Sequence, residues 1–362
     1  MTDPGLILVT GSGGAHGGVG VANKVVALLR ERGRPVRAMV HHDDERADDL
    51  RALGADIVVG DLTRPGDVAK ALDSVQRMFF SMSLSPSFLE AAATVATVAR
   101  AVGNLDALVA ISQMTVSQMD ALSTSESHHQ RLHFLAEQVF NWSGLPVVHV
   151  RPTVFLDTGL FTTLAAHSIA DSGTIRLPFG TGHTSPIAPD DVARVVATVL
   201  TDAERYVGRV LELTGPRSQD MNGVAGEYAR ALHKPVSYVD VPWDTWAAQT
   251  LAYANLGPYV EQHIETMARL HRENRYDRVT DTVEEVTGQP AESVEHFVAR
   301  RSRRRASDGD ERTRVPAVER PGWRARRPAR PRPAREPGAL EHRRAPVRDD
   351  ASRARRGHRL RA

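Results

Sequence analysis

Six glycines fall within the ten residues GSGGAHGGVG, positions 11–20, between an apolar run and an apolar helical pattern. Glycine at such a place lets the backbone turn sharply and approach a pyrophosphate, and the N-terminus of the next helix supplies N–H donors and a favourable dipole. A glycine-rich stretch by itself also fits a flexible surface loop. The order of strand, loop and helix favours a cradle for the phosphates of a dinucleotide.

The spacing of these glycines indicates which kind of dinucleotide fold is present. Gly11-x-x-Gly14-x-x-Gly17 differs from the commoner G-x-G-x-x-G and is typical of relatives of the short-chain dehydrogenases. A second register, Gly14-x-x-Gly17-x-x-Gly20, overlaps the first, so two starts of the helix are open. The residues predicted to hold the cofactor at this loop are Gly11, Ser12, Gly14, Ala15, His16 and Gly17.

The end of the second predicted strand bears on the choice between NAD and NADP. An acidic residue at this place would accept the ribose hydroxyls of NAD, whereas here His41 and His42 follow the strand and the acidic pair 43–44 comes late. Arg37 and Arg46 are close in sequence and would tolerate a 2′-phosphate. We therefore expect NADP rather than NAD, with Arg37 and His41 among the cofactor-binding residues.

Short apolar runs and longer helical patterns alternate up to residue 152, which is typical of repeated βα units with a parallel sheet. Helical patterns between them stop at Gly33 and Gly103. We expect an α/β fold with a doubly wound, parallel-sheet Rossmann domain over residues 1–152. The predicted strands are 6–10, 36–40, 56–60, 77–81, 107–112 and 146–152.

Beyond residue 152 the alternation loosens. Residues 153–299 predict a smaller α/β lobe for substrate or partner, with some segments returning to the Rossmann sheet. Residues 300–362 are dense in Arg and Pro and predict a disordered basic tail, because such a segment buries too little apolar surface to order. That tail would be the one part able to bind nucleic acid; an out-of-frame or drifting extension is the favoured explanation.

Composition limits the remaining function classes. The 362 residues include no Cys, which excludes disulfides, thiol catalysis and cysteine metal sites. No secretory leader and no run of about 18 apolar residues is present, so we expect a cytoplasmic protein without a membrane span. The 22 Arg and 8 acidic residues after position 299 give that segment +14, so residues 1–299 carry −12 of the total +2.

With these motifs, the chain resembles the NmrA-like branch of the atypical short-chain dehydrogenase/reductase family over residues 5–299. The matching pieces are VTGSGGAHG, RPVRAMV, GADIVVGDLTRPGDVAKAL, WSGLPVVHVRPTVF and SPIAPDDVARVVATVL. The resemblance implies an NAD(P)-binding Rossmann fold in which Asp61 and Leu62 flank the adenine. It also implies that Ser81 and Met82 line the cofactor and that Pro152 lies near the nicotinamide.

The usual catalytic pair of short-chain dehydrogenases, Tyr-x-x-x-Lys, is missing. The six tyrosines all lie after position 205, and none has lysine four residues later. By the family's spacing before Ser143, His129 and His133 fall at the tyrosine and lysine positions, one helical turn apart. Either histidine could donate a proton, or both could be polar residues lining a cleft without a catalytic role. Two histidines alone make no zinc site, and no metal is expected.

Ser112 stands where active relatives place a substrate-orienting serine, and a serine capping a strand end is an equal interpretation. Two functions follow. The favoured one is an oxidoreductase that uses NAD(P)H to reduce a small quinone-like or unsaturated acceptor, with a proton from His129, His133 or water. The other is a non-enzymatic redox sensor in which NAD(P) binding regulates a protein partner.

Overall fold

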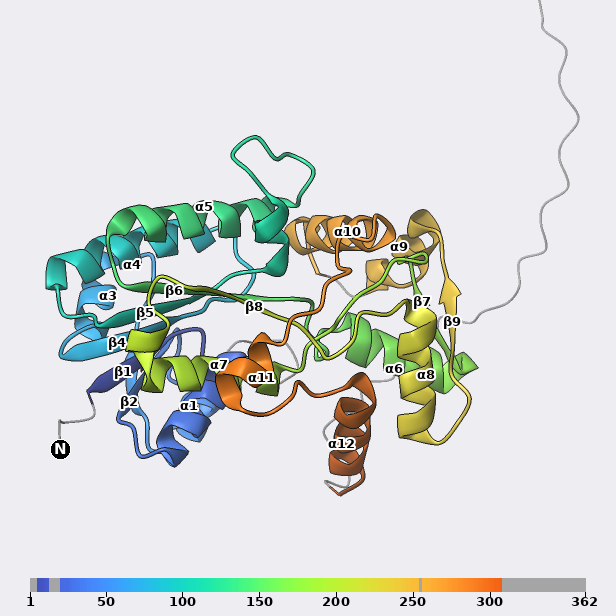
Figure 1. Ribbon diagram of the computed structural model, residues 1–362, viewed down its shortest axis with the longest axis horizontal. Coiled ribbons are helices and arrows are strands. Elements are labelled where there is room, and N and C mark those ends of the chain that lie inside the picture. Colours follow the sequence, from blue (N-terminus) through green and yellow to red (C-terminus); the bar gives the residue numbers. More distant parts are fainter. Residues whose placement is uncertain (1–4, 13–19, 254–255, 308–362) are drawn as a thin grey trace, which may run out of the picture. The chain divides into compact units, whose positions relative to one another are not determined.

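A seven-stranded parallel sheet forms the centre of the computed structural model, which describes residues 5–12, 20–253 and 256–307 (Figure 1). The strand order is β3-β2-β1-β4-β5-β6-β8, and every neighbouring pair is parallel. This confirms the predicted doubly wound α/β class. The strands are β1 (Leu6–Val9), β2 (Val36–Val40), β3 (Asp56–Val59), β4 (Val75–Phe80), β5 (Ala107–Ile111), β6 (Val147–Pro152) and β8 (Val210–Leu213).

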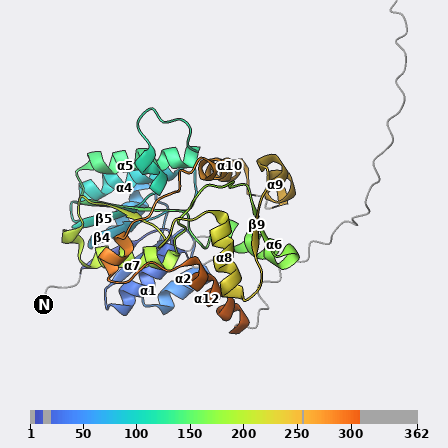
Figure 2. The ribbon, with the colours of Figure 1, turned by 45° about the vertical axis from the view of Figure 1, so that its right-hand side comes forward.

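Helices cover both faces of the sheet because the strands are apolar on both sides (Figure 2). In β1, for example, Ile7 and Val9 pack toward one layer of helices, while Leu8 packs toward the other. The first layer contains α1 (Val21–Glu31), α2 (Glu45–Ala52), α7 (Pro189–Thr201) and α11 (Thr282–Thr287). The second contains α3 (Pro65–Ala71), α4 (Phe88–Val102) and α5 (His128–Ser143).

Local signals in the sequence set the ends of these helices. α4 ends at Gly103, whose φ of 72° is the left-handed conformation that glycine adopts most readily. α5 begins at a capping box, in which the Ser127 hydroxyl accepts from the Gln130 N–H and the Gln130 side chain accepts from the Ser127 N–H. The cap fixes where the α5 histidines start.

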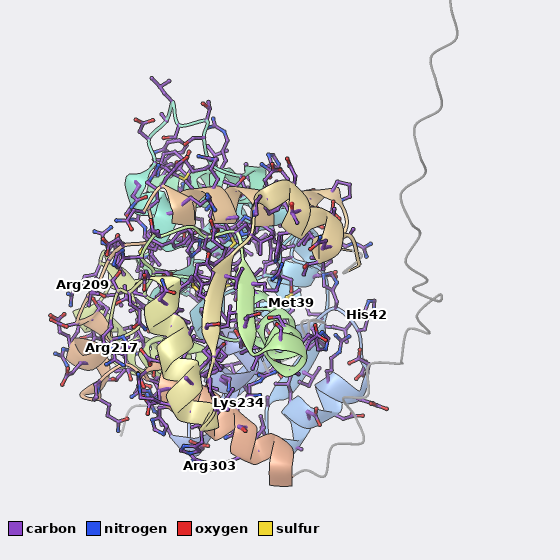
Figure 3. All side chains as sticks on the ribbon, turned by 90° about the vertical axis from the view of Figure 1, so that its right-hand side faces the viewer. Met39, His42, Arg209, Arg217, Lys234 and Arg303 are labelled. Atoms are coloured by element: carbon purple, nitrogen blue, oxygen red, sulfur yellow. The ribbon has the colours of Figure 1, made fainter. Side chains whose placement is uncertain are left out.

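The segment after β6 builds a second lobe and also returns to the sheet. β8 pairs with β6 at one sheet edge, and α7 packs against α1. The second lobe has its own core around Phe161, Phe179 and Trp246. Its elements are the parallel pair β7 (Thr174–Leu177) and β9 (Ser237–Asp240), with α6 (Ala165–Ser172), α8 (Met221–Leu232), α9 (Trp243–Gln249), α10 (Pro258–Arg272) and α12 (Val294–Ser307) (Figure 3).

Short one-turn helices connect several of these elements. None of the helices in the described ranges is long and apolar enough to cross a membrane. The turns are η1 (Met114–Gln118), η2 (Leu160–Leu164), η3 (Ala203–Arg205) and η4 (Leu251–Tyr253).

The helix α12 extends across the boundary predicted at residue 300 and ends at Ser307. Phe297 and Val298 are buried in the core of the second lobe, and Arg300 pairs with Asp190 at 3.1 Å and with Glu292 at 2.8 Å. The first basic residues of the predicted tail therefore belong to an ordered helix. The rest of that tail, residues 308–362, lies outside the described residues.

Candidate functional site

A pocket of about 230 Å³ opens at the carboxyl ends of β1, β2 and β4. Because the strand order reverses direction between β1 and β4, this edge is the place where doubly wound sheets bind ligands. The pocket is lined by Thr10, Gly11, Ser12, Met39, Val40, His41, His42, Asp44, Arg46, Gly60, Leu62, Ser81, Met82, Ser83 and Ser85.

Gly11 follows β1 and lies against the backbone that follows β4. Its φ is +78°, and a Cβ atom added to it would lie 2.6 Å from the Ser81 carbonyl oxygen. Two hydrogen bonds between Thr10 and Ser81 join the same two segments. The Ser81 N–H donates to Thr10 Oγ1 at 3.1 Å, and the Thr10 hydroxyl donates to the Ser81 carbonyl at 2.9 Å. A side chain at position 11 would therefore collide with the backbone that follows β4, and the positive φ also favours glycine.

Of the predicted glycine-loop residues, the structure places Gly11 and Ser12 in the pocket wall. Ser12 is 7% exposed, and its Oγ has no hydrogen-bond partner within the described ranges. The other four, Gly14, Ala15, His16 and Gly17, lie outside the described residues.

Two buried apolar side chains form a wall suited to a flat base. Met39 of β2 and Leu62 after β3 are 4% and 9% exposed and line the pocket. Asp61, expected beside Leu62, is not among the lining residues. Its carboxylate accepts from the Thr63 N–H at 2.9 Å and the Thr63 hydroxyl at 2.8 Å, and these bonds hold the pKa of Asp61 below its usual value.

The polar rim of the pocket comes from the residues between β2 and α2. His41 and His42 are exposed there, and His42 is labelled in Figure 3. Asp44 caps α2 by accepting from the Arg46 N–H at 3.1 Å, and its carboxylate lies 2.5 Å from the Arg46 guanidinium. The hydrogen bond from the Arg46 side chain is the main cause that lowers the pKa of Asp44. The rim thus carries one arginine, already paired, and two histidines.

Arg37, predicted to bind the cofactor, does not line this pocket. Its guanidinium lies 2.8 Å from Asp56 and donates to the carbonyls of Ala71 and Asp73 at 3.1 and 2.8 Å. Position 37 is near the start of β2, whereas the pocket lies at the end of that strand. Arg46, which follows the strand, takes the place on the rim.

The expected residues after β4, β5 and β6 are placed differently from one another. Ser81 and Met82 line the pocket. Ser112 follows β5, where its N–H donates to the Val150 carbonyl at 2.8 Å; the side chain is 5% exposed, and its Oγ has no partner within the described residues. Pro152 is the last residue of β6 and is buried, but it does not line the pocket.

The two α5 histidines lie together in the interior. His129 and His133 are 4% and 5% exposed, and their Nε2 atoms are 3.1 Å apart. Burial is the main cause that lowers the pKa of His129 to about 3, and it lowers the pKa of His133 well below the usual value. Both imidazoles are therefore neutral near pH 7, and neither lines the pocket.

Sequence reasoning missed the α10 residues that join these histidines. The Tyr259 hydroxyl lies 2.8 Å from His129 Nδ1, and His263 Nδ1 lies 2.8 Å from the Ser127 hydroxyl. The partners of these two hydrogen bonds are 130 and 136 residues apart in the chain, and no local pattern indicates such contacts. Within the described ranges, no group of three or more His, Asp or Glu could hold a metal ion.

The pocket and the strand order are those of a dinucleotide-binding α/β protein, and sequence comparison identifies the family. Residues 14–203, more than half of the chain, match the model of the NAD(P)H-binding family. The chain belongs to this NAD(P)H-binding family.

Similar proteins cover most of the chain. It is 28% identical over 294 residues to an NAD(P)H azoreductase of Xenophilus azovorans, spanning 81% of this chain and 96% of that protein. It is 29% identical over 301 residues to a (4-alkanoyl-5-oxo-2,5-dihydrofuran-3-yl)methyl phosphate reductase of Streptomyces griseus, spanning 81% and 99%.

Solved structures with the same fold include a reductase and a regulator. The NADPH-dependent quinone oxidoreductase of Escherichia coli, complexed with NADPH, superposes with a TM-score of 0.70 at 20% identity, covering 82% of this chain and 99% of that one. NmrA, a negative transcriptional regulator in complex with NADP, gives 0.66 at 16% identity, covering 84% and 98%. The fold is thus shared with NmrA, as the sequence resemblance implied.

Proposed function

We propose that this protein is an NAD(P)H-dependent reductase that transfers hydride to a small quinone-like or otherwise conjugated acceptor. The observation that carries the proposal is the pocket at the ends of β1, β2 and β4, whose wall contains Gly11 and Ser12, the first residues of the predicted phosphate loop. Support comes from two relatives, each aligned over nearly its whole length and each named as a reductase. The quinone oxidoreductase and a triphenylmethane reductase of Citrobacter share the fold.

The residues present fit such a cofactor. Bound NAD(P)H would supply the hydride from its nicotinamide ring. In this proposal Gly11 and Ser12 begin the phosphate cradle, and Met39 and Leu62 pack against the adenine. Gly14, Ala15, His16 and Gly17, which lie outside the described residues, stay predicted phosphate-binding residues.

The other expected contacts follow the path of the nucleotide along the strand ends. Ser81 and Met82 would lie along the cofactor beyond the adenosine, since they line the same pocket after β4. Pro152, at the end of β6, would approach the nicotinamide. Ser112 remains the residue proposed to orient the substrate that accepts the hydride. Its buried hydroxyl has no hydrogen-bond partner in the described ranges, so it can form a hydrogen bond with that substrate.

We propose water, rather than His129 or His133, as the proton donor. In the hydrogen-bonded chain that contains the pair, the innermost atom is His133 Nδ1, which is buried and has no partner within the described part of the chain. If His129 or His133 donated a proton, these hydrogen bonds could not bring a replacement proton from solvent. Burial also keeps both rings neutral, which removes the imidazolium as an acid near pH 7.

NADP is the proposed cofactor in preference to NAD. The rim presents His41, His42 and Arg46, and its acidic member, Asp44, is already engaged with Arg46 and with the N-terminus of α2. A 2′-phosphate would draw the Arg46 guanidinium from Asp44, because a phosphate dianion offers the stronger bidentate partner.

A regulatory role is the second candidate. The missing Tyr-x-x-x-Lys pair favours it, and so does the fold shared with NmrA, a negative transcriptional regulator. In that role NAD(P) binding would change a surface that contacts a protein partner, and no acceptor would be reduced.

An assay of NADPH oxidation distinguishes the reductase from the regulatory role. The absorbance of NADPH is monitored in the presence of each member of a panel of naphthoquinones and azo dyes. The reductase proposal expects saturable turnover with at least one acceptor, and turnover retained in His133→Gln. A Ser112→Ala variant should raise KM for the acceptor with little change in NADPH affinity. Tight NADPH binding without turnover on any acceptor would favour the regulatory candidate.

A further inference from the structure

The loop that follows β4 forms one side of the cofactor pocket and is held at three points. This pocket loop, residues 81–87, contributes Ser81, Met82, Ser83 and Ser85 to the lining. Thr10 holds its first residue, as described above. At its far end the Ser87 N–H donates to the Ser85 hydroxyl at 3.1 Å and the Phe88 N–H donates to the Ser85 carbonyl at 3.3 Å, where α4 begins.

The third point of attachment comes from the second lobe. Tyr259, in the first turn of α10, places its hydroxyl 3.1 Å from the Ser85 carbonyl oxygen. Ser85 lies 174 residues away in the chain, so this bond joins α10 directly to the pocket wall. Among the described residues of the second lobe, Tyr259 is the one whose side chain forms a hydrogen bond with the pocket loop.

The direction of each bond around Tyr259 follows from its single hydroxyl proton. That proton goes to the Ser85 carbonyl, which can only accept, so His129 Nδ1–H must donate to the Tyr259 oxygen at 2.8 Å. His129 Nε2 then accepts from His133 Nε2–H at 3.1 Å. The tautomers of both histidines are thereby fixed, and each bond points toward the pocket loop.

The histidines that hold Tyr259 are themselves held by packing. Both rings lie against Phe88, with ring centroids 5.9 Å away for His129 and 4.1 Å away for His133. His263, one turn after Tyr259 on α10, places its ring centroid 5.1 Å from that of His129, and its Nδ1 shares a hydrogen bond with the Ser127 hydroxyl just before α5. The hydroxyl of Tyr259 is therefore set in place by α4, α5 and α10 together.

We propose that Tyr259 is a positioning residue through which α10 of the second lobe fixes the pocket loop in the conformation that binds NAD(P)H. His129 acts with it by donating to its hydroxyl oxygen. The inference rests on the proposed function, since it assigns a role in cofactor binding to the same pocket. The proposal also gives a role to the buried histidines on the helix that carries the Tyr-x-x-x-Lys pair in short-chain dehydrogenases. Here these histidines hold a tyrosine of the second lobe in position.

The test is the affinity of the full chain for NADPH, measured by the change in NADPH fluorescence on binding. Tyr259→Phe keeps the ring and removes the hydroxyl, and we expect about 3- to 10-fold weaker binding. Tyr238→Phe is the matched control: its hydroxyl also bonds a backbone carbonyl, that of Leu177, but within the second lobe. That variant should bind NADPH as the parent does.

A second pair of variants tests the donor. His129→Asn keeps an N–H donor and should lose less affinity than His129→Leu, which has none. In turnover, Tyr259→Phe should raise KM for NADPH while kcat stays near that of the parent. Equal NADPH affinity of the parent and Tyr259→Phe would overturn this inference alone, whereas a parent that does not bind NADPH would overturn the proposed function and the inference with it.

Discussion

The carbonyl oxygen of Ser81 lies 2.6 Å from the position that a Cβ atom on Gly11 would occupy. The Gly11→Ala variant must therefore move the pocket loop or β1, and it must also hold alanine at a φ of +78°, which costs about 1–2 kcal/mol. We expect NADPH affinity to fall at least about tenfold, because the displaced backbone is the one that we propose approaches the phosphates.

Gly66→Ala separates this effect from a general effect of replacing glycine. Gly66 lies in α3, and a Cβ atom there meets no other atom within 4 Å. Alanine in a helix should leave the chain as stable as the parent or more so. Unchanged NADPH affinity in Gly11→Ala, with Gly66→Ala as reference, would show that the phosphate cradle lies elsewhere.

Arg46→Ala tests the preference between the two cofactors. Removing the guanidinium takes away the proposed partner of the 2′-phosphate and frees Asp44 to accept from ribose hydroxyls, so NADPH affinity should fall by about tenfold and NADH affinity should hold or rise. Arg51→Ala is the control, since Arg51 is on the same helix but pairs with Asp43 and Asp48 outside the pocket. A parallel loss for both cofactors would contradict the assignment of Arg46.

Buried neutral histidines should make stability depend on pH. Burial lowers the pKa of His129 to about 3, and those of His263 and His271 to about 4. As pH falls below 6.5, the unfolded chain takes up protons at these sites and the folded chain does not, so the free energy of unfolding falls. Each histidine contributes a slope of up to about 1.4 kcal/mol per pH unit until its folded pKa is reached. Urea unfolding between pH 7 and pH 4.5 measures this slope.

His271→Phe should reduce the slope of unfolding free energy against pH by the contribution of one proton, up to about 1.4 kcal/mol per pH unit. The His271 ring is stacked between Phe179 and Tyr276, with centroids 4.0 Å away on each side, so phenylalanine can take its place. Its Nε2 has no hydrogen-bond partner within the described residues, and its Nδ1 bonds only the Met267 carbonyl one turn earlier. A variant with the full slope of the parent would show that His271 is protonated in the folded chain near pH 6.

We predict that the part of α12 after residue 299 contributes to the stability of the fold. A chain ending at Ser307 should unfold at the same urea concentration as the full chain, whereas a chain ending at Val298 should lose about 1–3 kcal/mol because Asp190 and Glu292 lose Arg300. Arg300→Met should reproduce most of that loss. Arg303→Met, at an exposed position of the same helix, serves as the control (Figure 3).

The sheet could be predicted from sequence because local patterns carry it. Apolar runs bounded by turn residues gave the six strands up to residue 152 to within two residues at each end, and glycines marked where helices stop. Gly11 lies where a close backbone approach restricts the position to glycine, which a glycine-rich pattern can indicate. Leu62, Ser81 and Met82 line the pocket, and their contacts with a cofactor stay predictions.

The features that the sequence did not indicate depend on contacts between distant segments. Arg37 looked close to the cofactor in sequence, but its place early in β2 puts it beside Asp56 on the neighbouring strand. The spacing of His129 and His133 on one helix was right, whereas their burial against α10 has no local signal. The helical pattern of α12 is hidden by its arginines, since its buried apolar residues Val294, Phe297 and Val298 all lie in its first five positions.

The reductase account is tested most directly by a single turnover of protein loaded with NADPH and mixed with a soluble naphthoquinone in the absence of oxygen. The account predicts that bound NADPH is oxidised at a rate that saturates with acceptor, that NADPH carrying deuterium at the transferred position reacts more slowly, and that Gly11→Ala loses the reaction. NADPH that binds to the parent but is not oxidised by any acceptor of the panel would contradict it.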